Sequence, residues 1–295
     1  MKRILVLALV FAMVFQSCKE RDPFEGVPAF VSVEEAFVDI SDPMQGTAMH
    51  NISNCYLSVE GKTIGIFEIP FEVPVLASGK VRIDIEPGIK SSGQDARRSV
   101  YPMLENYLVD TVLVPDQTLK LTPHYSYRKG VDFIFMENFD QLGTKFETAD
   151  SSAYAFSITQ DGACEGYSMK VEIPKDDYSG GFECRTSDVY SISENGETFL
   201  EVSYKCNDLF DFGMYGLMES ATSITGKRER AYTFYPTEGK WKHVYIKLNE
   251  AVGYSSSTSG QFQPFFSAYR RDSISPVGQN TEIFIDNIKL LHIEN

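Results

Sequence analysis

The sequence predicts an all-β protein that folds as two successive β-sandwiches. Short runs of alternating apolar and polar residues recur along the chain, and clusters of Gly, Pro, Ser, Asn and Asp separate them. Helical periodicity is almost absent, and the only helical turns expected are short ones around Val33–Phe37 and Pro102–Tyr107. With 295 residues, the chain has room for about two domains with buried cores.

The expected strands follow one another along the whole chain. In Lys80–Glu86 every second residue is a branched apolar one and the others are charged, the pattern of a half-buried strand. The same reasoning gives strands at Ala29–Val33, Asn54–Val59, Thr63–Ile69, Lys80–Glu86, Thr111–Val114, Thr118–Pro123, Asp132–Phe135, Tyr154–Ile158, Tyr167–Ile173, Phe199–Cys206, Ala231–Tyr235, His243–Leu248, Gln261–Tyr269 and Glu282–His292.

The first residues predict export rather than a domain. Lys2 and Arg3 precede an unbroken apolar run of 12 residues, Ile4–Phe15, which fits a signal peptide and is too short to span a bilayer. The Ser17-Cys18 pair that follows resembles the lipobox of bacterial lipoproteins. That resemblance implies a signal peptide over residues 1–17 and lipidation of Cys18, with a plain secretory signal as the alternative.

The residues after Cys18 bear on localisation. Residues 18–27 are expected to form a tether, and Lys19–Asp22 resembles the signal that sends lipoproteins of one Gram-negative group to the outer leaflet. The implied location is the outer membrane, with the protein anchored by lipid and facing the cell exterior. Membrane attachment would depend on several acyl chains, since a single chain binds only marginally.

A polar joint at residues 127–130 marks the expected domain boundary. Residues 28–127 have the size of an immunoglobulin-like β-sandwich, and residues 131–295 have the size of a larger sandwich. The stretches Glu137–Asp140, Glu165–Val171, Gly239–Lys242 and Ile283–Leu290 resemble, in this order, the jelly-roll modules of carbohydrate-binding families. In the first domain, the order of Gly65–Pro70, Pro87–Lys90, Arg97-Arg98 and Tyr101-Pro102 resembles that in bacterial surface lipoproteins that join the same two domains, which implies no activity.

The jelly-roll resemblance also implies a structural calcium ion. In many such modules, acidic residues at the start and end of the domain hold one Ca²⁺. The matching carboxylates here are Glu137, Asp140 and Asp286, with a carbonyl near Gly166 as a fourth ligand. The alternative is that Asp286 only accepts hydrogen bonds from a turn. The strand around Asp286 is expected to turn Phe284 and Ile288 to one face of the sheet and Ile283 and Ile285 to the other.

Charge and motifs exclude several functions. A net charge of −14 argues against binding nucleic acid, because many phosphate contacts need clustered basic side chains. The sequence has no zinc spacing, no Gly-x-Ser-x-Gly elbow and no phosphate-binding glycine loop, so we expect no enzyme. The four cysteines after Cys18 are expected to be reduced core residues, with Cys184 and Cys206 as the pair to consider if a disulfide forms.

The class of function that these exclusions leave is the binding of a ligand. Aromatic residues make up 13% of the chain, and sugars stack on exposed aromatic rings while polar side chains hold their hydroxyl groups. The sequence therefore predicts a non-catalytic module that binds a glycan or another surface ligand, through Tyr215, Tyr232, Tyr269, Arg270 and Arg271 on one concave sheet. The alternative is a structural or accessory component of a cell-surface protein assembly, recognised by a broad apolar patch.

Overall fold

The computed structural model describes residues 26–93, 96–217, 226–253, 257, 259–272 and 274–294. The predicted signal peptide and Cys18 lie outside these residues. Within the described part of the chain, no helix is both long enough and apolar enough to cross a membrane. Almost all regular structure there is β, which confirms the predicted fold class.

The helices in the described residues are short and are not the predicted ones. They are the 3-10 turn η1 (Pro43–Gln45) and helix α2 (Asn249–Gly253). Residues 34–36 instead link strand β1 (Ala29–Val33) to strand β2 (Phe37–Asp39), because these strands pair with different partners. Residues 102–106 form a turn and an irregular stretch before the next strand, so both expected helical turns are wrong.

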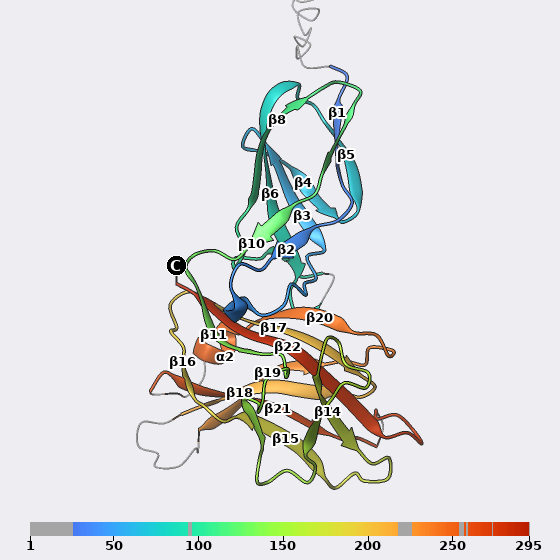
Figure 1. Cartoon of the computed structure of the whole chain (residues 1–295), viewed down its shortest axis with the longest axis vertical. Coiled ribbons are helices and arrows are strands. Elements are labelled where there is room, and N and C mark those ends of the chain that lie inside the picture. The colour runs from blue at the N-terminus through green and yellow to red at the C-terminus, as the bar shows by residue number, and fades with distance from the viewer. Residues whose placement is uncertain are drawn as a thin grey trace, which may run out of the picture.

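The N-terminal domain is a sandwich of two sheets (Figure 1). One sheet contains β4 (Lys62–Glu68), β3 (Asn54–Val59), β6 (Gly79–Lys90), β7 (Arg98–Val100) and β8 (Tyr107–Leu113). Opposite it lie β5 (Phe71–Val75), β1 and β9 (Thr118–Leu121), followed by the pair β2 and β10 (His124–Ser126). The alternation predicted for β6 holds, because Val81, Ile83 and Ile85 are all in the core between the sheets.

The C-terminal domain is a larger sandwich of two antiparallel six-stranded sheets. The sheet that lies against the N-terminal domain, called the proximal sheet, contains β13 (Phe156–Thr159), β14 (Ser168–Ile173), β22 (Thr281–Ile293), β17 (Glu197–Cys206), β20 (Lys242–Lys247) and β11 (Val131–Glu137). The other, the distal sheet, contains β12 (Phe146–Thr148), β15 (Gly181–Thr186), β21 (Gln261–Tyr269), β18 (Phe210–Gly216), β19 (Lys227–Phe234) and β16 (Tyr190–Ser191).

Each of these two sheets sends one face into a shared core. Leu200 and Val202 of β17 meet Phe212 and Phe266 of the distal sheet in a single buried cluster. Cys184 and Cys206 are buried there as free thiols, Cys164 is a partly buried free thiol, and Cys55 is a buried one in the first domain.

Part of the outer face of the proximal sheet is covered by the first domain (Figure 1). Phe199, Tyr245 and Leu291 of that sheet form one buried cluster with side chains of the N-terminal domain that include Tyr101 and Tyr125. Hydrogen bonds cross the same interface: the Tyr232 hydroxyl donates to the Ser92 carbonyl at 2.8 Å, and Lys289 Nζ donates to the Thr47 carbonyl at 2.9 Å. The two domains are therefore joined by a buried interface rather than by a linker alone.

A buried ionic cluster lies in this interface. Glu201 accepts hydrogen bonds from the hydroxyl groups of Tyr101 and Tyr127, and its carboxylate lies 3.5 Å from Lys289 Nζ. Glu201 and Lys289 are both 1% exposed. Burial on its own raises the pKa of Glu201, but the attraction of Lys289 and the hydrogen bonds outweigh it and hold that pKa below its usual range. The ion pair thus bridges proximal-sheet strands under two tyrosines of the first domain.

Candidate functional site

The outer face of the distal sheet carries an unusual density of charged and aromatic side chains. Alternation along each strand decides which residues reach it. In β15, Phe182 and Cys184 enter the core, so Glu183 and its neighbour Arg185 face outward. In β18 and β21 the same alternation turns outward Asp211, Tyr215, Phe265, Ser267 and Tyr269. In β19 a register shift opposite Phe212 and Gly213 brings Arg228 and Arg230 to this face, although Tyr232 and Phe234 pack on the core. We call this surface the distal face.

A glycine in β18 makes room for an aromatic ring on the distal face. A Cβ atom at Gly213 would lie 2.3 Å from Cζ of Phe265, a distance that no side chain tolerates. The Phe265 ring therefore lies across the bare backbone of Gly213, with the Tyr215 ring 4.9 Å from it, centroid to centroid. Any larger residue at position 213 would displace the floor of this surface.

Glu183 organises the centre of the distal face. Its carboxylate accepts hydrogen bonds from Arg185 Nε at 2.7 Å, from the Tyr215 hydroxyl at 3.0 Å and from Arg228 Nε at 3.3 Å. The two guanidinium groups lie over aromatic rings, Arg185 at 4.3 Å from the Tyr215 centroid and Arg228 at 4.2 Å from that of Phe265. These two rings are consequently covered by cations and are not open for stacking by a ligand.

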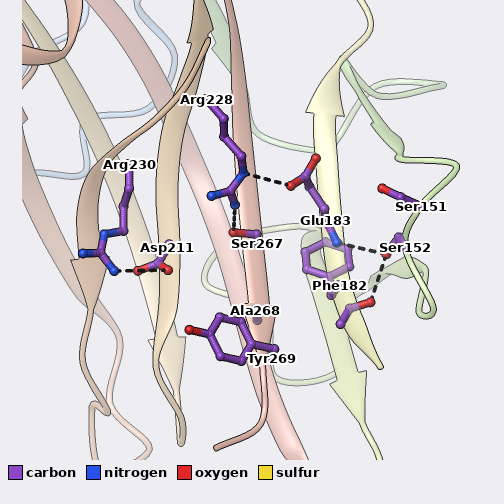
Figure 2. A pocket seen from close by; sticks show the side chains of 11 residues that line it. Ser151, Ser152, Phe182, Glu183, Asp211, Arg228, Arg230, Ser267, Ala268 and Tyr269 are labelled. Atoms are coloured by element: carbon purple, nitrogen blue, oxygen red, sulfur yellow. Dashed lines mark hydrogen bonds and ion pairs between the residues drawn. The ribbon is translucent and has the colours of Figure 1, made fainter. Parts of the chain in front are cut away.

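A shallow depression of about 480 Å³ opens beside this network. Figure 2 shows side chains converging on it from β19, β18, β21 and β15, and from the loop that carries Ser151 and Ser152. It crosses the strands rather than following one of them. Four adjacent strands spaced about 4.8 Å apart make it about 14 Å long, which suits an extended ligand of several units.

One end of the depression is aromatic and cationic. The Tyr269 ring is 50% exposed there, and the guanidinium of Arg271 lies 4.5 Å from its centroid. Asp211 is nearly buried beneath Arg230 and Arg271, which each place a nitrogen 3.9 Å from its carboxylate. Tyr269 is thus the aromatic side chain of this end that a ligand can reach.

A second hollow of about 330 Å³ continues the depression past Ser151, a residue that lines both. Gln263 lies on its floor and is 4% exposed, and its Nε2 donates to the Thr186 carbonyl at 2.6 Å. The Oε1 atom of Gln263 is buried without a hydrogen-bond partner among the described residues. Buried polar atoms in native proteins normally have partners, so this oxygen is an acceptor in need of a donor.

The structure brings together three of the five predicted ligand-binding residues. Tyr215, Tyr269 and Arg271 lie on or beside the distal face. Tyr232 does not: it pairs with Phe212, packs against the core and donates its hydroxyl hydrogen to the first domain. Arg270 is 2% exposed, and the predicted placement of both residues on the concave face is wrong.

The position of Arg270 has a structural reason. Its guanidinium donates to the carbonyls of Pro276 and Gln279 and to the Thr281 hydroxyl, at 2.8, 3.1 and 2.8 Å. It follows Tyr269 directly, so the end of β21 turns the two side chains to opposite sides. Arg270 holds the segment that leads into β22 and has no atom on the distal face.

Sequence reasoning missed the residues at the centre of the distal face. Glu183 and Asp211 belong to β15 and β18, two strands absent from the predicted set, and Arg228 and Arg230 precede the start predicted for β19. The sequence does contain the pattern that predicts these strands. Segments 181–186 and 210–216 both alternate apolar with polar or small residues, and charged residues at 228 and 230 occupy one face of the next strand.

The predicted calcium ligands do not come together as a set. Glu137 pairs with Ile288 on the core side of the proximal sheet, and its oxygens accept hydrogen bonds from the backbone N–H groups of Phe139 and Lys145 at 2.8 and 2.6 Å. Asp286 pairs with Ser203 on the opposite side of that sheet. Among the described residues, no group of three His, Cys, Asp or Glu side chains is placed to hold a metal ion.

Asp140 and Asp286 do meet at one loop. Asp286 accepts from the Ser168 hydroxyl at 2.7 Å and from the Glu165 N–H at 3.4 Å, while Asp140 accepts from the Tyr167 N–H at 2.9 Å. Their oxygens are therefore occupied in holding the loop around Gly166. This matches the alternative set out from the sequence, in which Asp286 accepts hydrogen bonds from a turn.

A bulge in β22 explains the separation. Asn287 has φ of +48°, and the register with β17 shifts at this point. As a result Ile288 points into the core together with Ile283 and Ile285, and Phe284 points away from it. The predicted pairing of Ile288 with Phe284 on one face is wrong, because the extra residue of a bulge reverses the alternation.

Comparison with known proteins returned structural neighbours only. No family model and no curated protein matches the chain. A carbohydrate-binding module of family 29 is 13% identical and aligns over 55% of this chain and 86% of its own, with a TM-score of 0.33. The family 11 module of Clostridium thermocellum, solved with a β-1,3-1,4-mixed-linked tetrasaccharide, is 13% identical over 52% of this chain and 94% of its own, with a TM-score of 0.36.

Proposed function

We propose that this protein is a non-catalytic module that binds a glycan on the distal face of its second domain. The observation that carries the proposal is the depression across four strands, with the half-exposed Tyr269 ring at the end of β21 and polar side chains along it. Aromatic rings that bury an apolar face and hydrogen-bonding groups at the rim are what an oligosaccharide requires.

Binding fits the site better than catalysis does. Glycoside hydrolysis uses two carboxyl groups that face the bond to be cleaved. The two carboxylates in this depression, Glu183 and Asp211, are instead covered by arginines and engaged with neighbouring side chains, Glu183 with Arg185 and Asp211 with Thr233. They position the surface rather than face a ligand.

The proposal includes the cellular setting. The signal peptide and Cys18 support an outer-membrane lipoprotein, and the first described strand starts at the end of the molecule far from the second domain (Figure 1). A lipid anchor at that end would leave the distal face directed outward, away from the membrane. This arrangement is what a surface-exposed receptor for an external glycan needs.

The test is a glycan array followed by titration of the best ligand, using the mature chain with Cys18→Ala so that it carries no lipid. Tyr269→Ala should weaken binding at least about tenfold, or 1.4 kcal/mol. Tyr167→Ala is the matched control, because Tyr167 is 40% exposed but belongs to the loop before β14. Equal losses in both variants, or binding to no glycan at all, would refute the proposal.

The alternative function is an accessory role in a cell-surface protein assembly. The observation that favours it is the outward face of β8, where Leu108 and Val112 are 58% and 52% exposed. Absence of binding to every glycan, together with membrane proteins that co-purify with the wild-type chain and not with Leu108→Ser, would select this alternative.

A further inference from the structure

The arginines at the cationic end of the distal face bear on the chemical class of the ligand. The chain as a whole has a net charge of −14, yet Arg228 and Arg230 line the depression and Arg271 lies beside it, next to Asp211 and Tyr269. Their side chains are 42%, 58% and 22% exposed, whereas that of Asp211 is 8% exposed. A ligand that enters this end therefore meets guanidinium groups first, with the carboxylate beneath them.

These guanidinium groups retain donors that the protein does not use. Arg228 donates through Nε to Glu183 and through Nη2 to Ser267, and its Nη1 has no hydrogen bond within the described residues. The polar contact of Arg230 is the 3.9 Å approach to Asp211, which is longer than a hydrogen bond. A guanidinium has five N–H donors and no acceptor, so this end needs a ligand rich in acceptors.

Asp211 does not satisfy these groups. It faces two arginines at 3.9 Å and accepts its hydrogen bond from the Thr233 hydroxyl. A sugar hydroxyl both donates and accepts, so a neutral glycan would bring O–H donors that these guanidinium groups cannot accept. A carboxylate or a sulfate ester accepts only, and it forms stronger, charge-assisted bonds with arginine.

We propose that the glycan bound by this face is acidic and places a carboxylate or sulfate group among Arg228, Arg230 and Arg271. This inference rests on the proposed function, and it specifies the chemical class of the ligand. It also predicts how the ligand is oriented along the site. Glu147 and Asp150 line the second hollow, so the anionic group belongs at the Tyr269 end and neutral sugar units belong past Ser151.

The test compares two acidic polymers and the uncharged form of one of them. The mature Cys18→Ala chain is titrated calorimetrically with polygalacturonate, with the same polymer after its carboxyl groups are reduced to alcohols, and with dextran sulfate. We expect binding to at least one acidic polymer, loss of it on carboxyl reduction where the uronate is the ligand, and weakening as salt is raised. Polygalacturonate and dextran sulfate separate a uronate carboxylate from a sulfate ester.

Two variants locate the effect. Arg230→Gln should weaken binding of the acidic polymer about tenfold, since it removes the most exposed of the three charges. Lys227→Gln is the matched control: it removes one positive charge from the same strand, on a side chain that is 53% exposed and pairs with Glu229. Both variants should keep the wild-type melting temperature.

The outcomes separate this inference from the proposed function. Equal affinity for a neutral glycan and the acidic polymers, or equal losses in Arg230→Gln and Lys227→Gln, would overturn the acidic ligand while glycan binding stands. The same holds if only neutral glycans bind. Failure of every polymer and every array member to bind would overturn the proposed function itself.

Discussion

Replacing Lys289 with Met should strongly destabilise the folded chain. Lys289 is 1% exposed, and its ammonium lies 3.5 Å from the Glu201 carboxylate and donates to the Tyr127 hydroxyl at 3.0 Å. Methionine has a similar length and no charge, so the variant keeps most of the packing and removes the cation. What remains is a buried carboxylate that has lost its counter-charge.

The magnitude follows from that remaining carboxylate. Breaking a buried ion pair on one side costs about 3–5 kcal/mol, because the desolvated partner is no longer compensated. At about 2 °C per kcal/mol for a chain of this size, the melting temperature should fall by about 6–10 °C. The loss falls on the interface between the domains, since the cluster lies there.

The effect should shrink at low pH. In the wild type, the pKa of Glu201 is held below its usual range, so the ion pair contributes stability at neutral pH that is lost as pH falls toward that pKa. In the variant, the attraction of Lys289 is lost while burial remains, so we expect the pKa of Glu201 to rise, against the smaller lowering by His243 and the Tyr101 hydroxyl. The folded variant then gains stability as pH falls and the carboxyl group takes up a proton, so the difference between the two chains narrows from pH 7 to pH 4.

Thermal unfolding at pH 7 and pH 4, followed by circular dichroism, measures the difference in melting temperature between the two chains. Lys247→Met is the control, since Lys247 forms an ion pair at 2.7 Å with Glu197 in the same sheet but is 45% exposed. An exposed pair of that kind is worth about 0–1 kcal/mol. If Lys289→Met lowered the melting temperature no more than Lys247→Met, or by the same amount at both pH values, the reasoning would be refuted.

Three further predictions concern the remaining carboxylates and the anchor. Burial raises the pKa of Asp286 from 3.8 to about 7, so the stability of the folded chain should decline as pH rises across that window, and Asp286→Asn should flatten the decline in urea titrations. Calcium and EDTA should give the same melting temperature, because the oxygens of Glu137 and Asp286 face opposite sides of their sheet; stabilisation by calcium would contradict this. Cys18→Ala should move the protein from membrane to soluble fractions, and its retention in membranes would show that another segment anchors it.

Alternation of residues made the fold readable from the sequence. In β6 the apolar positions predicted to face a core do face one, because this strand runs without irregularity over the residues concerned. The error in β22 comes from a single residue, Asn287, whose positive φ inserts a bulge. Alternation carries no information about such an insertion, since Asn adopts both ordinary and left-handed backbone conformations.

The candidate site was harder to predict for a different reason. Tyr215 and Tyr269 were predicted because an aromatic ring can stack on a sugar whatever its neighbours are, so the residue type alone identifies it. Glu183 and Asp211 were not, since a carboxylate acquires its role only through partners on neighbouring strands, such as Arg228 from β19. The pairing of β15 with β21 and of β21 with β18 brings residues about 30 to 80 positions apart into one surface, and the sequence does not specify that order.

The arrangement of the domains determines which surface of the second sandwich can meet a large ligand. A sandwich has two outer faces, and here the proximal one is partly occupied by the first domain, through the buried cluster of Tyr101, Tyr245 and Leu291. The depression lies on the outer face of the distal sheet, whereas the hydrogen bond of that sheet to the first domain, from Tyr232 to Ser92, comes from a side chain that packs against the core (Figure 1). Because the interface is apolar, hydrogen-bonded and contains a buried ion pair, reorienting the domains would expose groups that are costly to leave unpaired. The N-terminal domain thus acts as a stiff spacer, and an extended ligand can approach the distal face without contacting it.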